Sequence, residues 1–119
     1  MPYRCEEIKS LRQREHIIKN NKVVCIDLYA DWCGPCKNIA PMYNKLAEKY
    51  DEQFKCLLVK ENVENEFTSL SGDYNPSKGI PAFIFYLNGE ILMDDNDNVI
   101  DVVGFDKRKI ERIIQDLIK

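Results

Sequence analysis

The sequence contains no apolar run long enough to cross a membrane, since its longest runs have strand length and a spanning helix needs roughly 20 residues. Basic residues are not in excess either: 17 Lys and Arg stand against 20 Asp and Glu, and the formal net charge is −3. The two signs are interspersed, which excludes the basic footprint of a nucleic-acid or membrane-surface protein. Residues 1–7 show no apolar signal core. We therefore expect a cytoplasmic protein with no nucleic-acid and no membrane partner.

Cysteine does not have the pattern of a secreted disulfide framework, because the chain holds five cysteines, an odd number. One redox pair and three reduced thiols in a reducing compartment fit this count better. A closed zinc site is an alternative, but it needs four ligands, commonly in two close pairs. The sequence has one close pair, Cys33 and Cys36. The other candidate ligands are scattered along the chain: Cys5, Cys25, Cys56 and His16.

The close pair belongs to the segment Trp-Cys-Gly-Pro-Cys at residues 32–36. Upstream, Val23–Tyr29 is an apolar run rich in β-branched residues, which predicts a strand buried on both faces. Downstream, apolar residues recur at the spacing of one helix face: Ile39, Met42, Tyr43, Leu46, Ala47 and Tyr50. Gly34 and Pro35 suit a strand-to-helix turn, because glycine tolerates unusual dihedrals and proline fits the first helical turn.

This position predicts different roles for the two thiols. Cys33 lies at the helix N-terminus, where the partial positive charge and the free N–H groups lower the pKa of a thiol and make it a nucleophile. Cys36 lies one turn further into the helix, where it is better shielded and can attack a mixed disulfide on Cys33. We expect thiol–disulfide chemistry. The alternative is a structural disulfide or two inert thiols.

At these residues the chain resembles the thioredoxins, and the similarity extends over nearly all of its 119 residues. Further matches are the acid Asp27 before the cysteines, the cis-proline loop Gly79-Ile80-Pro81, the hairpin turn Asn88-Gly89, the glycine loop Val103-Gly104 and a C-terminal amphipathic helix. The length agrees with a single domain, residues 1–119. The resemblance implies an α/β fold of the thioredoxin type, with a central five-stranded mixed β-sheet flanked by four helices.

Asp27 is a charged residue inside an otherwise apolar strand. Burial raises the pKa of a carboxyl group, and the resemblance implies that Asp27 accepts and returns the proton of Cys36, directly or through a water. The alternative is an edge acid that reaches solvent. In the predicted third strand, Lys60 stands where the family often has a catalytic lysine near this acid. A solvent-facing charge at a strand end is the alternative for Lys60.

The resemblance also implies a substrate-binding surface beside the cysteines. A cis bond between Ile80 and Pro81 would expose the backbone of Ile80, which can then pair with an extended substrate strand. Such recognition barely depends on side chains and suits a general protein reductase. The apolar docking surface would comprise Trp32, Gly34, Pro35, Ile80 and Gly104. Plain packing is the alternative for Trp32.

Gly34 and Pro35 match the reducing branch of the family, whereas isomerases and bacterial oxidants have histidine at the second position. The resemblance therefore implies a protein-disulfide reductase, nearer the reference value of about −270 mV for thioredoxin itself than the about −180 mV of protein disulfide isomerase. The sequence lacks a G-x-G-x-x-G nucleotide fingerprint, so we expect no bound cofactor. The implied partners are disulfide-containing target proteins and an NADPH-linked thioredoxin reductase. The alternatives are a secretory oxidase or isomerase and a binding subunit whose cysteines are incidental.

Further strands are predicted from apolar runs and turn residues. Residues 3–8 favour a short edge strand, and residues 54–63 favour a third strand after the helix that carries the cysteines. Ala82–Leu87 predicts a strand, followed by the two-residue turn Asn88-Gly89 and a returning strand at residues 90–93.

Helices are predicted from apolar spacing and capping residues. Ser10 and Gln13 form a capping pair for a helix that extends to about Asn20, and Pro41 is expected to kink the helix after the cysteines. Asp106 is the expected cap of the last helix. Two apolar helix faces are predicted, namely Val63, Phe67, Leu70 and Tyr74, and then Ile110, Ile113, Ile114, Leu117 and Ile118.

The chain is several residues longer than the usual thioredoxin between Glu90 and Gly104. The extra length contains an acidic run at residues 94–98, for which we expect a solvated turn. A calcium loop is the alternative, but the glycine and terminal glutamate of an EF-hand are missing. A smaller excess surrounds residues 75–78. Phe105 stands where the family commonly has a small residue, and its bulk is expected to narrow the docking surface and the range of substrates.

The remaining thiols and the histidine receive no catalytic role. Cys25 and Cys56 are expected to be small buried hydrophobes. Cys5, near the N-terminus, is expected to be exposed and oxidisable. His16 is expected at the surface of the first helix.

Overall fold

The computed structural model describes residues 3–53, 55–70 and 73–119, and the strands of these residues form one mixed sheet. The strands are β1 (Glu7–Ile8), β2 (Val23–Tyr29), β3 (Leu57–Asn62), β4 (Ala82–Leu87), β5 (Glu90–Ile91) and β6 (Asp101–Val103). β2 occupies the centre, parallel to β3 and antiparallel to β4. Six of its seven residues are buried, as the apolar run predicts. β1 lies parallel to the far edge of β3.

The outer edge of β4 carries two short strands instead of one. β5 pairs with β4 at Tyr86 and Leu87, whereas β6 pairs with it from Ala82 to Ile84. The two strands share the fifth position of the predicted five-stranded sheet, so the described residues form six strands in five positions. β6 is the strand that the sequence pattern misses, because its three residues lie close behind the acidic run.

Residues 92–100 separate β5 from β6 and form a small hairpin closed by an isolated antiparallel bridge. At its tip, Asp94 Oδ1 accepts hydrogen bonds from the backbone N–H groups of Asn96 and Asn98, at 2.8 and 3.0 Å. Residues 94–98 are exposed. The acidic run is therefore a solvated turn, which confirms the prediction.

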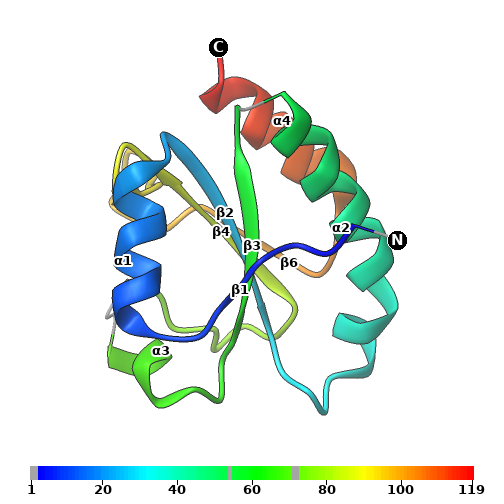
Figure 1. Ribbon diagram of the computed structural model, residues 1–119. Coiled ribbons are helices and arrows are strands. Elements are labelled where there is room, and N and C mark those ends of the chain that lie inside the picture. Colours follow the sequence, from blue (N-terminus) through cyan, green and yellow to red (C-terminus); the bar gives the residue numbers. More distant parts are fainter. Residues whose placement is uncertain (1–2, 54, 71–72) are drawn as a thin grey trace.

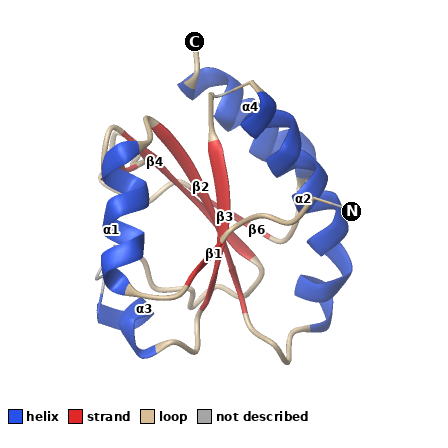
Figure 2. Cartoon of the chain, in the orientation of Figure 1, coloured by secondary structure: helices blue, strands red, loops and turns tan. Residues whose placement is uncertain are grey.

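Two helices cover each face of the sheet (Figures 1 and 2). α2 (Gly34–Glu52) and α4 (Lys107–Leu117) pack against one face, where Tyr43 and Ile110 are among the buried contacts. α1 (Leu11–Asn20) and α3 (Glu66–Leu70) lie on the other face, where Ile17 packs against residues of β2 and β4. In the described residues, no helix is both long and apolar enough to span a bilayer.

The predicted start signals of the helices and of the hairpin are confirmed. Ser10 Oγ accepts the backbone N–H of Gln13 at 3.1 Å, and Asp106 caps α4 in the same way. Asn88 and Gly89 have φ values of 52° and 86°, as a two-residue hairpin turn with positive φ at both positions requires. α2 continues through Pro41, and the kink expected there stays a prediction.

The third helix is much shorter than its predicted apolar face. α3 spans five residues, so Val63 and Tyr74 lie outside it. Both side chains nevertheless pack against the same core as Phe67. The spacing thus reflects a shared contact surface rather than one continuous helix, and the helix prediction over residues 63–74 is wrong in extent.

Two predicted strands are also too long. β1 contains Glu7 and Ile8 alone, because these are the residues that run beside Lys60 and Glu61 of β3. β3 begins at Leu57, and Phe54, where the predicted strand begins, lies outside the described residues.

Candidate functional site

The two cysteines of the motif form a disulfide at the start of α2, with their Cα atoms 5.3 Å apart. Cys33 is the N-cap of the helix, and its Sγ accepts the backbone N–H of Cys36 at 3.2 Å. The N–H of Cys33 donates to the carbonyl of Ala30 at 3.1 Å, which fixes the turn between β2 and α2. Cys33 Sγ therefore lies where N–H groups and the helix dipole favour negative charge on sulfur.

The sequence predicts that Cys36 is better shielded than Cys33. In the structure each cysteine is 4% exposed, so exposure does not distinguish them. Their surroundings do distinguish them. Cys33 lines a surface groove of about 570 Å³, and Cys36 is not among the groove residues. Of the two cysteines, Cys33 is therefore the one that borders the groove.

The groove combines the turn before α2 with two later segments of the chain. Trp32 contributes from the turn, and Gly34 and Pro35 contribute from the first turn of α2, as the resemblance implies. Trp32 is 69% exposed, so its indole is not packed in the core. Further lining residues are Val63, Pro76, Gly79 and Ile80. Sequence reasoning misses Val63, Pro76 and Gly79, although the extra residues at 75–78 mark one of these segments.

The peptide bond between Ile80 and Pro81 is cis, which confirms the prediction. The carbonyl oxygen of Ile80 lies 3.8 Å from Cys33 Sγ. Among the described residues, no backbone hydrogen bond is formed by the N–H or the C=O of Ile80. The backbone of Ile80 is therefore free to pair with an extended chain in the groove.

Two residues expected at or near the docking surface do not line this groove. Gly104 is not among the groove residues; its N–H donates to the carbonyl of Pro81 at 2.8 Å and so supports the cis-proline segment. The ring of Phe105 packs edge-on against Phe83 of β4, with centroids 5.8 Å apart. Phe105 therefore packs against the core and is not among the groove residues, and the expected restriction of substrate range stays a prediction.

The loop that contributes Pro76 is held by β6. Tyr74 donates its hydroxyl hydrogen bond to Asp101 Oδ2, and Lys78 Nζ lies 3.3 Å from the same oxygen. The two regions of extra length thus meet at Asp101, one of them forming part of the groove.

Asp27 is buried on the face of β2 that α2 covers, the same face as Cys25. Its Oδ1 has no hydrogen-bond partner among the described residues. Burial raises the pKa of Asp27 to about 7, and the positive charge of Lys60 opposes this rise. The alternative of an edge acid that reaches solvent is therefore wrong.

Lys60 combines the two interpretations that the sequence leaves open. It stands directly opposite Asp27 in the pairing of β2 with β3. Its side chain is 36% exposed, its ammonium group lies 3.8 Å from Glu7 Oε1, and the same group is 5.2 Å from the centroid of the Tyr29 ring. Lys60 thus acts on Asp27 through its charge, without a direct ion pair between them in the described part of the chain.

The other three cysteines are free and buried. Cys25 and Cys56 are small hydrophobes of the core, as expected, and burial raises the pKa of Cys56 to about 12. Cys5 was expected to be exposed, which is wrong: its N–H donates to Asn44 Oδ1 of α2 at 3.2 Å, and burial raises the pKa of its thiol to about 11. His16 is exposed on α1, as predicted.

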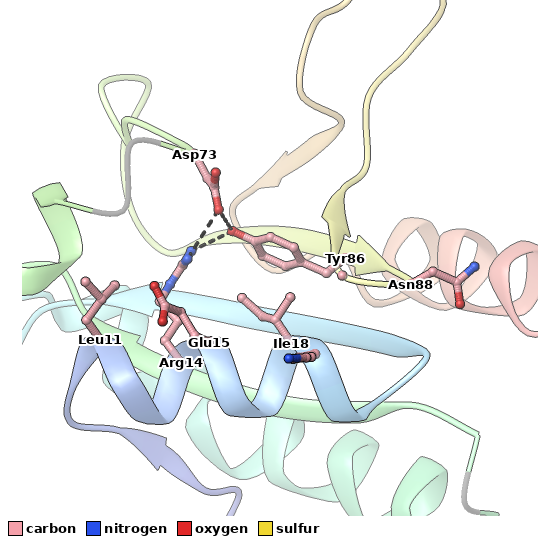
Figure 3. Close-up of a pocket in the computed structure, with 9 residues that line it drawn as sticks. Leu11, Arg14, Glu15, Ile18, Asp73, Tyr86 and Asn88 are labelled. Atoms are coloured by element: carbon pink, nitrogen blue, oxygen red, sulfur yellow. Dashed lines mark hydrogen bonds and ion pairs between the residues drawn. The ribbon is translucent and has the colours of Figure 1, made fainter.

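A second cavity, of about 470 Å³, lies on the other face of the sheet between α1 and the turn after β4 (Figure 3). Its wall contains the buried Arg14, whose guanidinium contacts Tyr86 Oη at 2.6 Å and Asp73 Oδ2 at 3.3 Å. Behind the cavity, Arg14 Nε donates to Glu61 Oε1 at 3.0 Å. Sequence reasoning misses this network, although Arg14 shares the spacing of Leu11 and Ile18 on α1.

Comparison with known proteins agrees with this geometry. The family model Thioredoxin matches residues 6–116. The chain belongs to the thioredoxin family. Members of this family named thioredoxin include a Mycoplasma genitalium protein that is 39% identical over 84 residues, or 70% of this chain and 76% of that protein. Thioredoxin 1 of Plasmodium falciparum is 32% identical over 96 residues, or 78% of this chain and 88% of its own length.

Solved structures of the family show the same fold. Malassezia sympodialis thioredoxin superposes with a TM-score of 0.77 at 28% identity, covering 100% of this chain and 96% of its own. Schistosoma mansoni thioredoxin gives 0.74 at 35% identity, covering 97% and 96%. The predicted thioredoxin fold, with its mixed sheet and flanking helices, is thereby confirmed.

Some relatives are much longer than this chain. Thioredoxin-T of Drosophila melanogaster is 43% identical over 77 residues, which are 64% of this chain and 46% of that protein. Thioredoxin-like protein 1 of Schizosaccharomyces pombe is 38% identical over 84 residues, which are 71% of this chain and 28% of that protein. The chain thus spans less than half of these two relatives.

Proposed function

We propose that this chain reduces disulfide bonds in other proteins. The observation that carries the proposal is the Cys33–Cys36 disulfide at a helix N-terminus, with Cys33 alone of the two cysteines lining an apolar groove. Membership of a family of thiol–disulfide oxidoreductases supports the same chemistry.

In the reduced protein, the Cys33 thiolate attacks one sulfur of a target disulfide. The target's other sulfur leaves as a thiolate and takes up a proton, and a mixed disulfide joins Cys33 to the target. Cys36, as thiolate, then attacks Cys33 Sγ, and the second target sulfur leaves. The target gains two electrons and two protons in total, and Cys33 and Cys36 are left as the disulfide described above.

Asp27 is the proposed proton acceptor for Cys36 in the second step. A pKa of about 7 leaves both forms of the carboxyl group available near neutral pH, so it can take the thiol proton and release it again. Lys60 keeps this pKa from rising further. The proposed role of Lys60 is to set the pH range in which Asp27 titrates, not to contact the substrate.

The groove is the proposed docking surface, and the backbone of Ile80 pairs with the target chain there. Apolar contact with Trp32 and Pro35 adds affinity without demanding a particular sequence. A Cβ built at the groove residue Gly34 meets no protein atom within 4 Å, so this side of the residue is open to the target chain. Pro81 and Gly104 support this surface from behind.

The reducing direction follows from Gly34 and Pro35 between the cysteines, by analogy with the family. We further propose that residues 1–119 form one domain, that an NADPH-linked thioredoxin reductase restores the dithiol, and that the protein acts in the cytoplasm. Three free, buried cysteines agree with a reducing compartment. No observation favours the oxidase, isomerase or binding-subunit alternatives.

Reduction of insulin disulfides in the presence of dithiothreitol tests the proposal. Wild type is expected to accelerate the reaction. Cys36→Ser, reduced beforehand and freed of dithiothreitol, is expected to stop after one covalent complex with insulin, because no thiol is then present to resolve the mixed disulfide. Cys56→Ala, which removes a buried thiol far from the motif in sequence, serves as the matched control and is expected to retain turnover. Turnover that persists in Cys33→Ser would contradict the proposal.

A further inference from the structure

A further groove, of about 600 Å³ and distinct from both the groove at Cys33 and the cavity beside Arg14, lies between α2, β3 and the N-terminal segment. Figure 1 shows this segment, in dark blue, running beside α2. The groove is lined by four cationic side chains, Arg4, Lys37, Lys45 and Lys60. It is lined by one acidic side chain, Glu48. The chain as a whole has a formal net charge of −3, so the groove concentrates positive charge against the balance of the molecule.

Most donors in this groove are not used by the protein itself. Within residues 3–53, 55–70 and 73–119, the charged groups of Arg4, Lys37 and Lys45 form no hydrogen bond or ion pair. Asn44 already accepts a backbone N–H on its Oδ1, so its amide NH₂ group remains as a further donor. The groove thus presents hydrogen-bond donors and positive charges that the described residues leave largely unpaired.

The groove residues of α2 begin one position after Cys36 and follow the helix. Lys37 comes directly after Cys36 in the sequence, and the groove residues of α2 extend from there to Glu48. These 11 helical steps cover about 16 Å, since a helix rises about 1.5 Å per residue. An extended chain rises about 3.3 Å per residue, so the groove matches about five residues of extended polypeptide. Between the charges, Ala40 and Pro41 provide apolar contact.

We infer that this groove binds an acidic segment, about five residues long, of the proteins whose disulfides the chain reduces. The inference rests on the proposed function, and it adds a preference for target chemistry. The carboxylates of the segment pair with Arg4, Lys37 and Lys45 while the target disulfide lies at Cys33. Because these cations are at the surface, the pairing accelerates productive encounter and is screened by salt.

Three disulfide peptides with a common core sequence test the inference, each carrying a short run of glutamate, serine or lysine beside the cysteine. We expect the glutamate peptide to be reduced with a kcat/KM about fivefold above that of the serine peptide at low ionic strength, and the lysine peptide to be slowest. The differences are expected to shrink at an ionic strength of about 0.5 M. Equal kcat/KM values for the three peptides at low ionic strength would overturn the inference.

Charge-reversal variants locate the effect. Lys37→Glu combined with Lys45→Glu is expected to remove the preference for glutamate. The matched control is Arg12→Glu combined with Lys19→Glu on α1, which makes the same change of net charge on the opposite face of the sheet. The control is expected to keep the preference. Equal loss of the preference in both double variants would show that overall charge is responsible, and would overturn the inference.

Binding of a cysteine-free glutamate peptide separates this inference from the proposed function, because it needs no disulfide chemistry. Wild type and the α1 control are expected to bind it, and the Lys37/Lys45 variant to bind at least about tenfold more weakly at low salt. Lack of binding to wild type would overturn the groove assignment whether or not insulin is reduced. Inorganic phosphate is the second competitor: displacement of the peptide by phosphate at matched ionic strength would show a small-anion site and contradict an extended segment.

Discussion

Asp27 and Glu61 are both buried carboxylates of the central sheet, on adjacent strands and one register step apart. They face opposite sides. Glu61 lies under α1 and is paired at 3.0 Å with the buried Arg14. Asp27 lies under α2 with no ion pair among the described residues, and Lys60 acts on it from a distance. One oxygen of each carboxylate, Asp27 Oδ1 and Glu61 Oε2, has no hydrogen-bond partner there.

The difference shows two ways in which a fold accommodates a buried acid. An unpaired buried carboxylate is costly, so it either receives a cation or holds a proton. Glu61 receives a cation and becomes a fixed part of the packing between α1 and the sheet. Asp27 holds a proton at low pH and loses it near pH 7, which is the behaviour required of a group that exchanges protons with a thiol.

The largest expected change in the free energy of unfolding comes from removing the cation that pairs with Glu61. Arg14→Met leaves Glu61 buried without its cation and is expected to lower the free energy of unfolding by about 3 to 5 kcal/mol, because an uncompensated buried charge remains. Combining it with Glu61→Leu is expected to restore most of the loss. Urea unfolding measures both variants. A loss below about 1 kcal/mol in Arg14→Met would contradict a structural ion pair.

Asp27→Asn is expected to raise the free energy of unfolding, whereas Arg14→Met lowers it. The size of this gain is expected to depend on pH. The pKa of Asp27 is about 7 in the folded protein, against about 3.9 for an unfolded chain, so the native state holds the extra proton between these values. Wild-type stability therefore falls as pH rises from about 4 to about 7, by up to about 4 kcal/mol.

The asparagine variant should show no gain at pH 4 and a gain of this size at pH 8, measured by urea unfolding across the range. A gain independent of pH would show that the effect is not titration of Asp27. The same variant is expected to reduce insulin at least about tenfold more slowly, because the acceptor for the Cys36 proton is removed.

Lys60→Met sharpens the comparison by removing the distant cation. Lys60 lowers the pKa of Asp27, so its removal should move the pH midpoint of insulin reduction upward. Lys19→Met on α1 is the matched control and should leave the midpoint in place. A downward shift in Lys60→Met would show that the charge of Lys60 does not govern Asp27.

The smallest effect is expected at a third carboxylate, Asp101, whose side chain is largely buried and paired with Tyr74 and Lys78. Asp101→Asn weakens the hold on the loop that carries Pro76, and should raise KM for a protein disulfide about two- to fivefold with kcat nearly unchanged. Asp95→Asn makes the same chemical change in the exposed turn and should change neither constant. An unchanged KM in Asp101→Asn would show that the contacts of Asp101 with Tyr74 and Lys78 do not affect substrate binding in the groove.

The sequence predicts the redox site better than its surroundings, for physical reasons. The strand Val23–Tyr29 and the caps Ser10 and Asp106 depend on local pattern, and they are confirmed. The sequence predicts Cys5 at the surface and Phe105 at the docking surface, but both positions depend on contacts between segments distant in the sequence: Cys5 with Asn44, and Phe105 with Phe83.

The same reason explains what the sequence pattern misses. β6 exists because three residues pair with β4 across the intervening hairpin, and Arg14 is buried because Glu61 lies beneath it. Neither partner is adjacent in the chain. The unusual position of Asp27, by contrast, is visible in sequence, since a carboxylate within a continuous apolar strand already predicts burial.

The pH dependence of alkylation of the reduced protein, followed residue by residue by mass spectrometry, tests most directly that Cys33 is the activated thiol. The account predicts that Cys33 reacts first, with a midpoint below the about 8.5 of free cysteine, while Cys56 and Cys5 stay unreactive because burial raises their pKa values. Cys33 reacting with the midpoint of free cysteine, or no faster than Cys36, would contradict it.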